Sequence, residues 1–85
     1  MNEFMLNKYI DKLTVTHIKE YAKNQGIILK NNEDEIIYDF IKNNYMKLYK
    51  EDYNENIIKE LKCSLSFNTY EKVNLLYKEA KEKIK

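Results

Sequence analysis

His17 and Cys63 are the side chains of this sequence best suited to act as a base and a nucleophile, and there is one of each type. A histidine could also hold a metal, but Tyr21 occupies the fourth position after His17, where a second zinc ligand would stand on a helix. A reactive cysteine needs a neighbouring base, and nothing in the sequence ties Cys63 to His17. We therefore expect His17 on the exposed side of a first helical turn, and Cys63 as a small buried or half-buried side chain.

Three consecutive acidic residues, Glu33, Asp34 and Glu35, could attract a divalent cation. An EF-hand loop, however, needs alternating oxygen ligands, a central glycine and a distal glutamate, and this pattern is missing. Gly26 is the one glycine of the chain, so a glycine-rich phosphate loop is excluded. We interpret the acidic run as a helix start, where carboxylates face the positive end of the helix dipole. No catalytic, metal-binding or cofactor-binding residue is predicted.

Tyrosine is the residue type that stands out, with eight copies in 85 residues. It is favoured where one end of a side chain is dry and the other wet. Four of the tyrosines crowd the middle of the chain, and they cannot all be buried in so small a domain. An exposed cluster there would form a partner surface, and partly buried packing is the alternative. These four are Tyr38, Tyr45, Tyr49 and Tyr53.

Helices are the elements expected to position these side chains. The absence of proline and the single glycine argue against a turn-rich sandwich or barrel, which needs repeated left-handed or fixed backbone positions. Apolar residues recur instead at three- and four-residue spacing. We predict an all-α fold: a small bundle of four to five short helices in a single domain over residues 1–85. Its first helix is expected at about residues 3–12, followed by a helix, extended loop, helix unit at residues 14–43.

The ends of this unit are well marked. Thr14 is a good N-cap for its first helix, and Gly26 stands where a left-handed residue can close that helix. Residues 27–29 form a short apolar run rich in β-branching, which indicates an extended link. Asn32 is then expected to cap the second helix, with Glu35 three residues later in a capping box.

The region after the unit is harder to divide. Asn43 and Asn44 suggest a helix end, although Tyr45 and Leu48 continue the apolar phase. We expect residues 45–50 to form an irregular or extended connection, with a longer second helix as the alternative. Asp52 would then cap a third helix, with Glu55 in the box position.

The last helix carries the clearest amphipathic stripe of the chain. Asn68 and Glu71 have the spacing of a capping box, so the helix should run from about residue 69 to 83. Such a stripe can cover the helix's own core or contact a partner helix. The stripe consists of Val73, Leu76, Tyr77, Ala80 and Ile84.

Charge and hydropathy exclude several classes of protein. The 15 basic residues are all lysine and face 14 acidic ones, so the net charge of +1 implies no steering of a polyanion. No uncharged run approaches the roughly 20 residues of a membrane span, and the polar residues 1–13 do not form a secretion signal. With a lone cysteine, the chain is expected to be a reduced cytoplasmic protein.

Two families share parts of this pattern. The entry at Leu13–Val15, the turn at Gly26–Ile27, Ser66, and the stretch from Thr69 to Leu76 resemble the small YqfT-like family of low-GC Gram-positive bacteria, a domain of unknown function. This resemblance implies a bacterial cytosolic protein and supplies no activity or site residue. The segment from Leu13 through Gly26–Ile27 to residues 36–41 also resembles the helix, extended loop, helix pattern of SAP-type modules, many of which bind nucleic acid.

These observations predict a non-enzymatic helical protein, either a protein–protein interaction module or a self-associating one. The alternative is a weak nucleic-acid-binding module that uses the SAP-like unit, aided by lysines near the C-terminus. Lysine lacks the bidentate fork of arginine, so such binding would be nonspecific and sensitive to salt. The C-terminal lysines are Lys72, Lys78, Lys81, Lys83 and Lys85.

Overall fold

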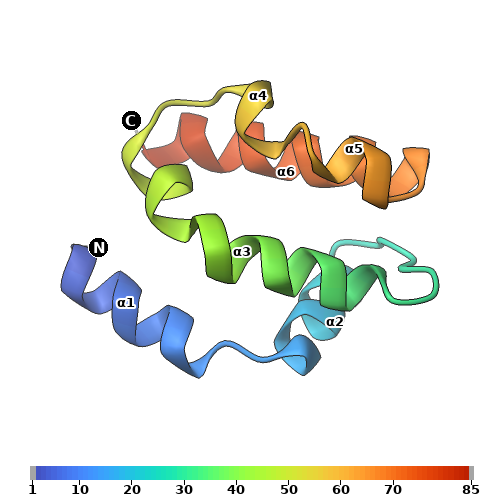
Figure 1. The fold of residues 1–85 in the computed structure, drawn as a ribbon, viewed down its shortest axis with the longest axis horizontal. Helices are drawn as coiled ribbons and strands as arrows, with labels where there is room; N and C mark the ends of the chain where they lie inside the picture. Colours follow the sequence, from blue (N-terminus) through green and yellow to red (C-terminus); the bar gives the residue numbers. More distant parts are fainter. Residues whose placement is uncertain (1, 85) are drawn as a thin grey trace.

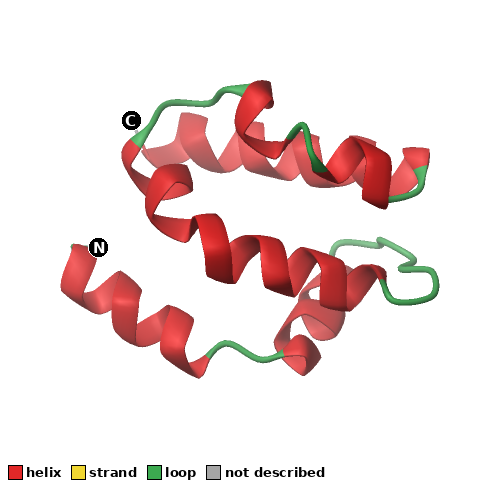
Figure 2. Ribbon diagram, in the orientation of Figure 1, coloured by secondary structure: helices red, strands yellow, loops and turns green. Residues whose placement is uncertain are grey.

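The structure, a computed structural model, describes residues 2–84, and every regular element in that range is a helix (Figures 1 and 2). The all-α prediction is therefore confirmed. Four helices have ten residues or more, and α4 and α5 are single turns. The side chain of Ile84, expected in the last apolar stripe, and Lys85 lie outside the described part of the chain. The helices are α1 (Glu3–Lys12), α2 (Val15–Asn24), α3 (Glu33–Lys50), α4 (Glu55–Ile58), α5 (Leu61–Ser64) and α6 (Phe67–Ile84).

The first two helices form where the sequence predicts them, because their ends have local partners. Asn2 caps α1 by accepting a hydrogen bond from the N–H of Met5 at 2.9 Å. Thr14 caps α2, and its Oγ1 accepts from the N–H of His17 at 3.3 Å. After α2, Gly26 adopts a φ of +72°, a left-handed conformation that costs glycine little.

The start of α3 is built differently from the predicted capping box of Asn32 and Glu35, which is wrong. The side chain of Asn32 makes no capping hydrogen bond, and Glu35 is exposed. Instead Glu33 reaches back, and its Oε1 accepts from the N–H of Lys30 at 2.8 Å. Asn31 between them has a φ of 45°, which asparagine tolerates better than most residues.

The predicted irregular connection at residues 45–50 is also wrong, because α3 continues to Lys50. Asn44, expected near a helix end, stays within the helix and donates its side-chain N–H to the carbonyl of Phe40 at 2.9 Å. Leu48 packs against the core, in phase with the apolar residues one and two turns earlier. The apolar periodicity thus outweighs the local preference of the two asparagines.

The helix that we predicted to begin after Asp52 is replaced by two single-turn helices, α4 and α5. Asn54 rather than Asp52 caps α4, and its Oδ1 accepts from the N–H of Asn56 at 3.0 Å. The N–H of Asn54 also donates to the hydroxyl of Tyr77 at 3.3 Å. Asn54 has the extended conformation usual for an N-cap, with a φ of −154° and a ψ of 110°.

The last helix begins at Phe67, two residues before the expected start. The carbonyl of Ser66 already accepts a helical hydrogen bond from the N–H of Tyr70 at 2.9 Å. Asn68 and Glu71, predicted to form a capping box, therefore lie inside the helix. Ser66, just before the helix, donates its hydroxyl to Oγ1 of Thr69 at 2.9 Å and its N–H to Oε2 of Glu33 at 2.6 Å.

The core lies around α3, which runs between α1 and α2 on one side and α4, α5 and α6 on the other (Figure 1). Ile58 and Tyr70 are its most deeply buried apolar side chains, at 2% and 1% exposed. Burying such side chains is the main favourable term of folding. The buried cluster comprises Ile37, Phe40, Ile58, Leu61, Leu65 and Tyr70.

Three lysines bind main-chain carbonyls where helices end. Lys42 donates from Nζ to the carbonyl of Ile10, near the end of α1, at 3.0 Å. Lys81 donates to the carbonyls of Leu48 and Tyr49, in the last turn of α3, at 2.7 and 3.0 Å. Lys72 reaches the carbonyl of Gly26 just beyond α2, at 3.3 Å. A cation in this position complements the negative end of a helix dipole.

Candidate functional site

His17 lies exposed in the first turn of α2, as predicted, and it has a structural role that the sequence analysis missed. Its Nδ1 accepts a hydrogen bond from the N–H of Thr14 at 3.1 Å, while Thr14 caps the N–H of His17. The two residues thus form a reciprocal capping box with histidine in the place usually held by glutamate or glutamine. The T-x-x-H spacing was the available signal. With Nδ1 occupied as an acceptor, the other ring nitrogen, Nε2, carries the N–H of the ring.

Cys63 is exposed in α5, so the prediction of a buried or half-buried side chain is wrong. Leu61 and Leu65, four residues apart, take the inward positions of this segment. Cys63 stands midway between them and points away from that face. No hydrogen bond joins Cys63 to His17, and Figure 1 shows α5 and α2 on different sides of α3.

The acidic run divides into buried and exposed members. Glu33 and Asp34 are 5% and 7% exposed, whereas Glu35 is exposed. Asp34 forms an ion pair with Lys19 of α2 at 3.4 Å. The run therefore attaches α3 to its neighbours, beyond the expected interaction with the dipole.

Among the described residues, Glu33 is the carboxylate that accepts the most hydrogen bonds. Its Oε2 accepts from the N–H of Ser66 at 2.6 Å, and its Oε1 accepts from the hydroxyl of Thr69 at 2.9 Å, in addition to the bond from Lys30. Burial alone would raise the pKa of this carboxyl group. The main-chain hydrogen bonds from Ser66 and Lys30, with that from the Thr69 hydroxyl, favour the charged form and bring the pKa below its ordinary value. With these donors Glu33 is a structural anion.

The four tyrosines of the predicted partner surface are all half-buried. Tyr45 donates its hydroxyl to Asn7 of α1 at 2.5 Å, and Tyr53 donates to Asn74 of α6 at 2.8 Å. The ring of Tyr38 lies 5.8 Å from the ammonium group of Lys42. Tyr38, Tyr45 and Tyr49 belong to α3, whereas Tyr53 precedes α4. At least two of the four hydroxyl groups thus serve contacts within the chain.

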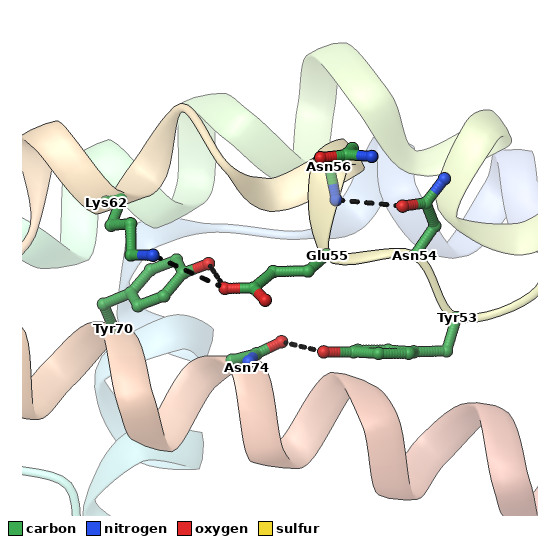
Figure 3. Close-up of polar contacts among 7 residues, drawn as sticks. All are labelled: Tyr53, Asn54, Glu55, Asn56, Lys62, Tyr70 and Asn74. Atoms are coloured by element: carbon green, nitrogen blue, oxygen red, sulfur yellow. Dashed lines mark hydrogen bonds and ion pairs between the residues drawn. The ribbon is translucent and has the colours of Figure 1, made fainter.

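A polar cluster joins the α4–α5 segment to α6 (Figure 3). The hydroxyl of Tyr70 donates to Oε2 of Glu55 at 2.7 Å, and Lys62 lies 3.8 Å from the same oxygen. Burial, together with the hydrogen bond and the negative charge of Glu55, raises the pKa of Tyr70 to about 12. A phenol held protonated in this way is a structural donor at neutral pH.

An apolar pocket of about 300 Å³ opens where α1, α2, α3 and α6 meet. A hollow of about 500 Å³ beside Lys19 and Lys23 is larger, but it opens more widely to solvent. The apolar pocket has a size at the lower end of the range for ligand sites. The helices and the 27–29 link supply aliphatic walls, with Tyr9, His17 and Tyr21 among the lining residues. The aliphatic lining residues are Ile10, Leu13, Ile18, Ala22, Ile27, Leu29, Ile37, Ile41, Val73 and Leu76.

Exposed apolar side chains continue from this pocket along α1. Tyr9 and Tyr21, which line it, are 59% and 55% exposed. Phe4 and Met5, in the first turn of α1, are 66% and 55% exposed. We call the pocket together with Phe4, Met5, Tyr9 and Tyr21 the α1–α2 face. The sequence analysis missed this face because helical spacing marks apolar positions without showing which of them the rest of the chain covers.

The family of the chain follows from comparison with known proteins. Residues 1–81 match the family described as "Protein of unknown function (DUF2624)". The chain belongs to this family. The expectation of a domain of unknown function is thereby confirmed, while the narrower likenesses to YqfT-like and SAP-type proteins stay predictions. No curated protein and no solved structure matches the chain.

The described residues of this family member offer few starting points for chemistry. Histidine, cysteine and acidic side chains do not gather anywhere in residues 2–84 in a group that could hold a metal ion. None of the described helices combines the length and the apolar character needed to cross a bilayer. The α1–α2 face contains the concave apolar part of the described surface.

Proposed function

We propose that the chain is a non-enzymatic protein-binding module and that the α1–α2 face is its docking surface. The observation that carries this proposal is the apolar pocket of about 300 Å³ with two tyrosines more than half exposed at its mouth. Tyrosine and aliphatic side chains around a recess are typical of the centre of a protein interface. Contiguous apolar surface of this kind marks interaction sites more often than it marks plain exposed surface.

The chemistry of the other candidate residues supports binding over catalysis. Glu33 has its oxygens engaged by three donors, and Tyr70 is buried against Glu55. His17 has one ring nitrogen engaged by Thr14. A catalytic site needs a nucleophile, a base and a charge-stabilising group within reach of one point, and these side chains serve separate structural contacts.

Nucleic-acid binding, the alternative, is less well supported because several lysines already have partners. Lys72 and Lys81 bind main-chain carbonyls, and the ammonium group of Lys78 lies 5.9 Å from the ring centroid of Tyr53. Phosphate would have to compete with these contacts. The start of α3, where a SAP-like unit would approach nucleic acid, carries the acidic residues 33–35, which repel phosphate.

An affinity capture with the full chain tests the proposed function. The bait is compared with a Tyr9→Ser, Tyr21→Ser double variant in an extract of the source cells, and captured proteins are quantified by mass spectrometry. Phe67→Ser is the matched control, because Phe67 is also an exposed aromatic residue, at 73%, but lies at the start of α6. Circular dichroism checks that all three proteins fold.

We expect at least one protein whose recovery falls several-fold with the double variant and is unchanged with Phe67→Ser. The proposal is wrong if no captured protein depends on Tyr9 and Tyr21. Retardation of nucleic acid at low salt by the full chain, lost when the C-terminal lysines are replaced by glutamine, would favour the alternative.

A further inference from the structure

The outer face of α1 pairs an apolar row with a basic row. Met5 and Tyr9 are four residues apart, as are Lys8 and Lys12, and all four are exposed. Residues three and four apart are neighbours on a helix surface. The two lysines therefore lie along one side of the apolar row that leads to the pocket.

These two lysines form no ion pair among the described residues. Glu3, the acid of the first turn of α1, pairs instead with Lys50 of α3 at 3.1 Å. The ammonium group of Lys8 lies 4.6 Å from the ring centroid of Phe4, which keeps the charge beside the apolar row. Lys12 lines a hollow next to the pocket whose one acidic residue, Glu20, belongs to α2. Asp11, the other acid of α1, is exposed three residues after Lys8 and lies on the side of the lysine row away from Met5 and Tyr9. The charges next to the apolar row on α1 are thus those of Lys8 and Lys12.

The length of the exposed apolar surface along α1 favours an elongated occupant over a small ligand. A compact ligand confined to about 300 Å³ would leave Phe4 and Met5 in water, since neither lines the pocket. From Phe4 to Leu13 the face follows nine residues, or about 14 Å of helix at 1.5 Å per residue. This length corresponds to two to three turns of a partner helix, which would cover both the pocket and the exposed row.

We propose that the occupant of the α1–α2 face is an acidic amphipathic helix of a partner protein. Its aliphatic row fills the pocket and covers Met5 and Tyr9, and its carboxylates lie against Lys8 and Lys12. This inference rests on the proposed function and adds the chemistry and the orientation of the partner, whose acidic side faces α1 and not Glu20 of α2.

Two designed peptides of equal length and identical aliphatic row provide the test. One carries glutamate beside the row and the other lysine, and each is labelled for fluorescence anisotropy with the full chain. We expect the glutamate peptide to bind more tightly than the lysine peptide, with a difference that shrinks as salt is added. Replacing Lys8 and Lys12 by glutamine should weaken binding of the glutamate peptide roughly two- to thirtyfold, the range for two exposed ion pairs. The control Lys47→Gln, Lys59→Gln removes two exposed lysines elsewhere and should leave binding unchanged.

The outcomes separate this inference from the function on which it rests. Equal binding of both peptides, or no effect of the Lys8 and Lys12 substitutions, overturns the acidic helix. If neither peptide binds while capture of a cellular protein still depends on Tyr9 and Tyr21, the inference fails and the proposed function stands. If decanoate shifts the NMR signals of pocket residues and neither peptide binds, the occupant is a small acyl ligand and the inference also fails.

Discussion

The carboxylate of Glu33 accepts a hydrogen bond from the main-chain N–H of Ser66 at 2.6 Å, and this contact joins the first residue of α3 to the residue before α6. The same carboxylate accepts from Lys30 in the link that follows α2. One side chain therefore holds two helix starts and a loop together. Because a carboxylate near a helix N-terminus also gains from the dipole, the contact places negative charge where both helices favour it.

Glu33→Gln should lower the free energy of unfolding by about 2 kcal/mol, because hydrogen bonds to a charged acceptor are stronger than those to an amide oxygen. The NH₂ group of glutamine would also face a hydrogen-bond donor, so at least one of the bonds to Glu33 would be lost. Urea unfolding followed by circular dichroism measures the effect. Glu35→Gln is the matched control, since Glu35 is exposed two residues later in the same turn. Equal stability of the two variants would show that the Glu33 contacts contribute little.

The contribution of Glu33 should depend on pH in a defined direction. Its pKa in the folded chain lies below the ordinary value of 4.5, so the folded state favours the charged form. This contribution is complete above about pH 5 and is lost as the pH falls through the pKa of the folded state. The stability difference between the wild-type chain and Glu33→Gln should therefore stay constant near neutral pH and shrink in acid. A difference that does not change down to low pH would contradict the assignment.

The sequence allowed α1 and α2 to be placed because their ends depend on neighbours within a few residues, such as Thr14 and Gly26. The later helices depend on contacts made across the fold. Asn54 is held by Tyr77, and Glu33 by Ser66. No local pattern reports such pairs, which explains why the start of α3 and the α4–α5 break were predicted wrongly.

The exposed apolar side of α1 also depends on contacts between distant parts of the chain, so the sequence did not predict it. Periodicity marks Ile10 and Leu13 as apolar positions on α1, but it does not say how much of the helix the rest of the chain covers. Met5 and Tyr9 remain more than half exposed because the packing of α1 on α3 leaves that side in water. Exposure of this kind depends on how the helices pack, which the sequence does not show. The predicted partner surface was therefore the tyrosine cluster at residues 38–53 and not the exposed side of α1.

Thr14→Ala should destabilise the chain by about 1 kcal/mol, the usual cost of losing an N-cap. The mutation removes the acceptor for the N–H of His17, whereas the main-chain N–H of residue 14 can still donate to Nδ1 of His17. Thr16→Ala is the control, because Thr16 lies exposed within the helix. Thermal unfolding of both variants provides the comparison, and a larger loss for Thr16→Ala would rule out the capping box as a source of stability.

Tyr70 should ionise only at high pH in the folded chain. Burial and the hydrogen bond to Glu55 raise its pKa from 10.0 to about 12. Because this folded-state pKa is raised, the associated stability is complete below about pH 10 and is lost as the pH rises toward 12. Ultraviolet titration of the eight tyrosines should show a late component that disappears in Tyr70→Phe and persists in Tyr9→Phe. A titration curve that Tyr70→Phe leaves unchanged would contradict the buried phenol.

Lys81→Met should destabilise the end of α3 even though the substitution is on α6. Lys81 donates to the carbonyls of Leu48 and Tyr49 in the last turn of α3, which ends at Lys50. Methionine keeps most of the aliphatic length and removes the donor, so we expect a loss of about 1 kcal/mol. Lys83→Met is the matched control, since Lys83 is exposed two residues later. Amide hydrogen exchange should locate the change at residues 47–51, because the last turn of α3 opens more often once it loses the contact with Lys81. Faster exchange confined to α6 would mean that Lys81 acts only within its own helix.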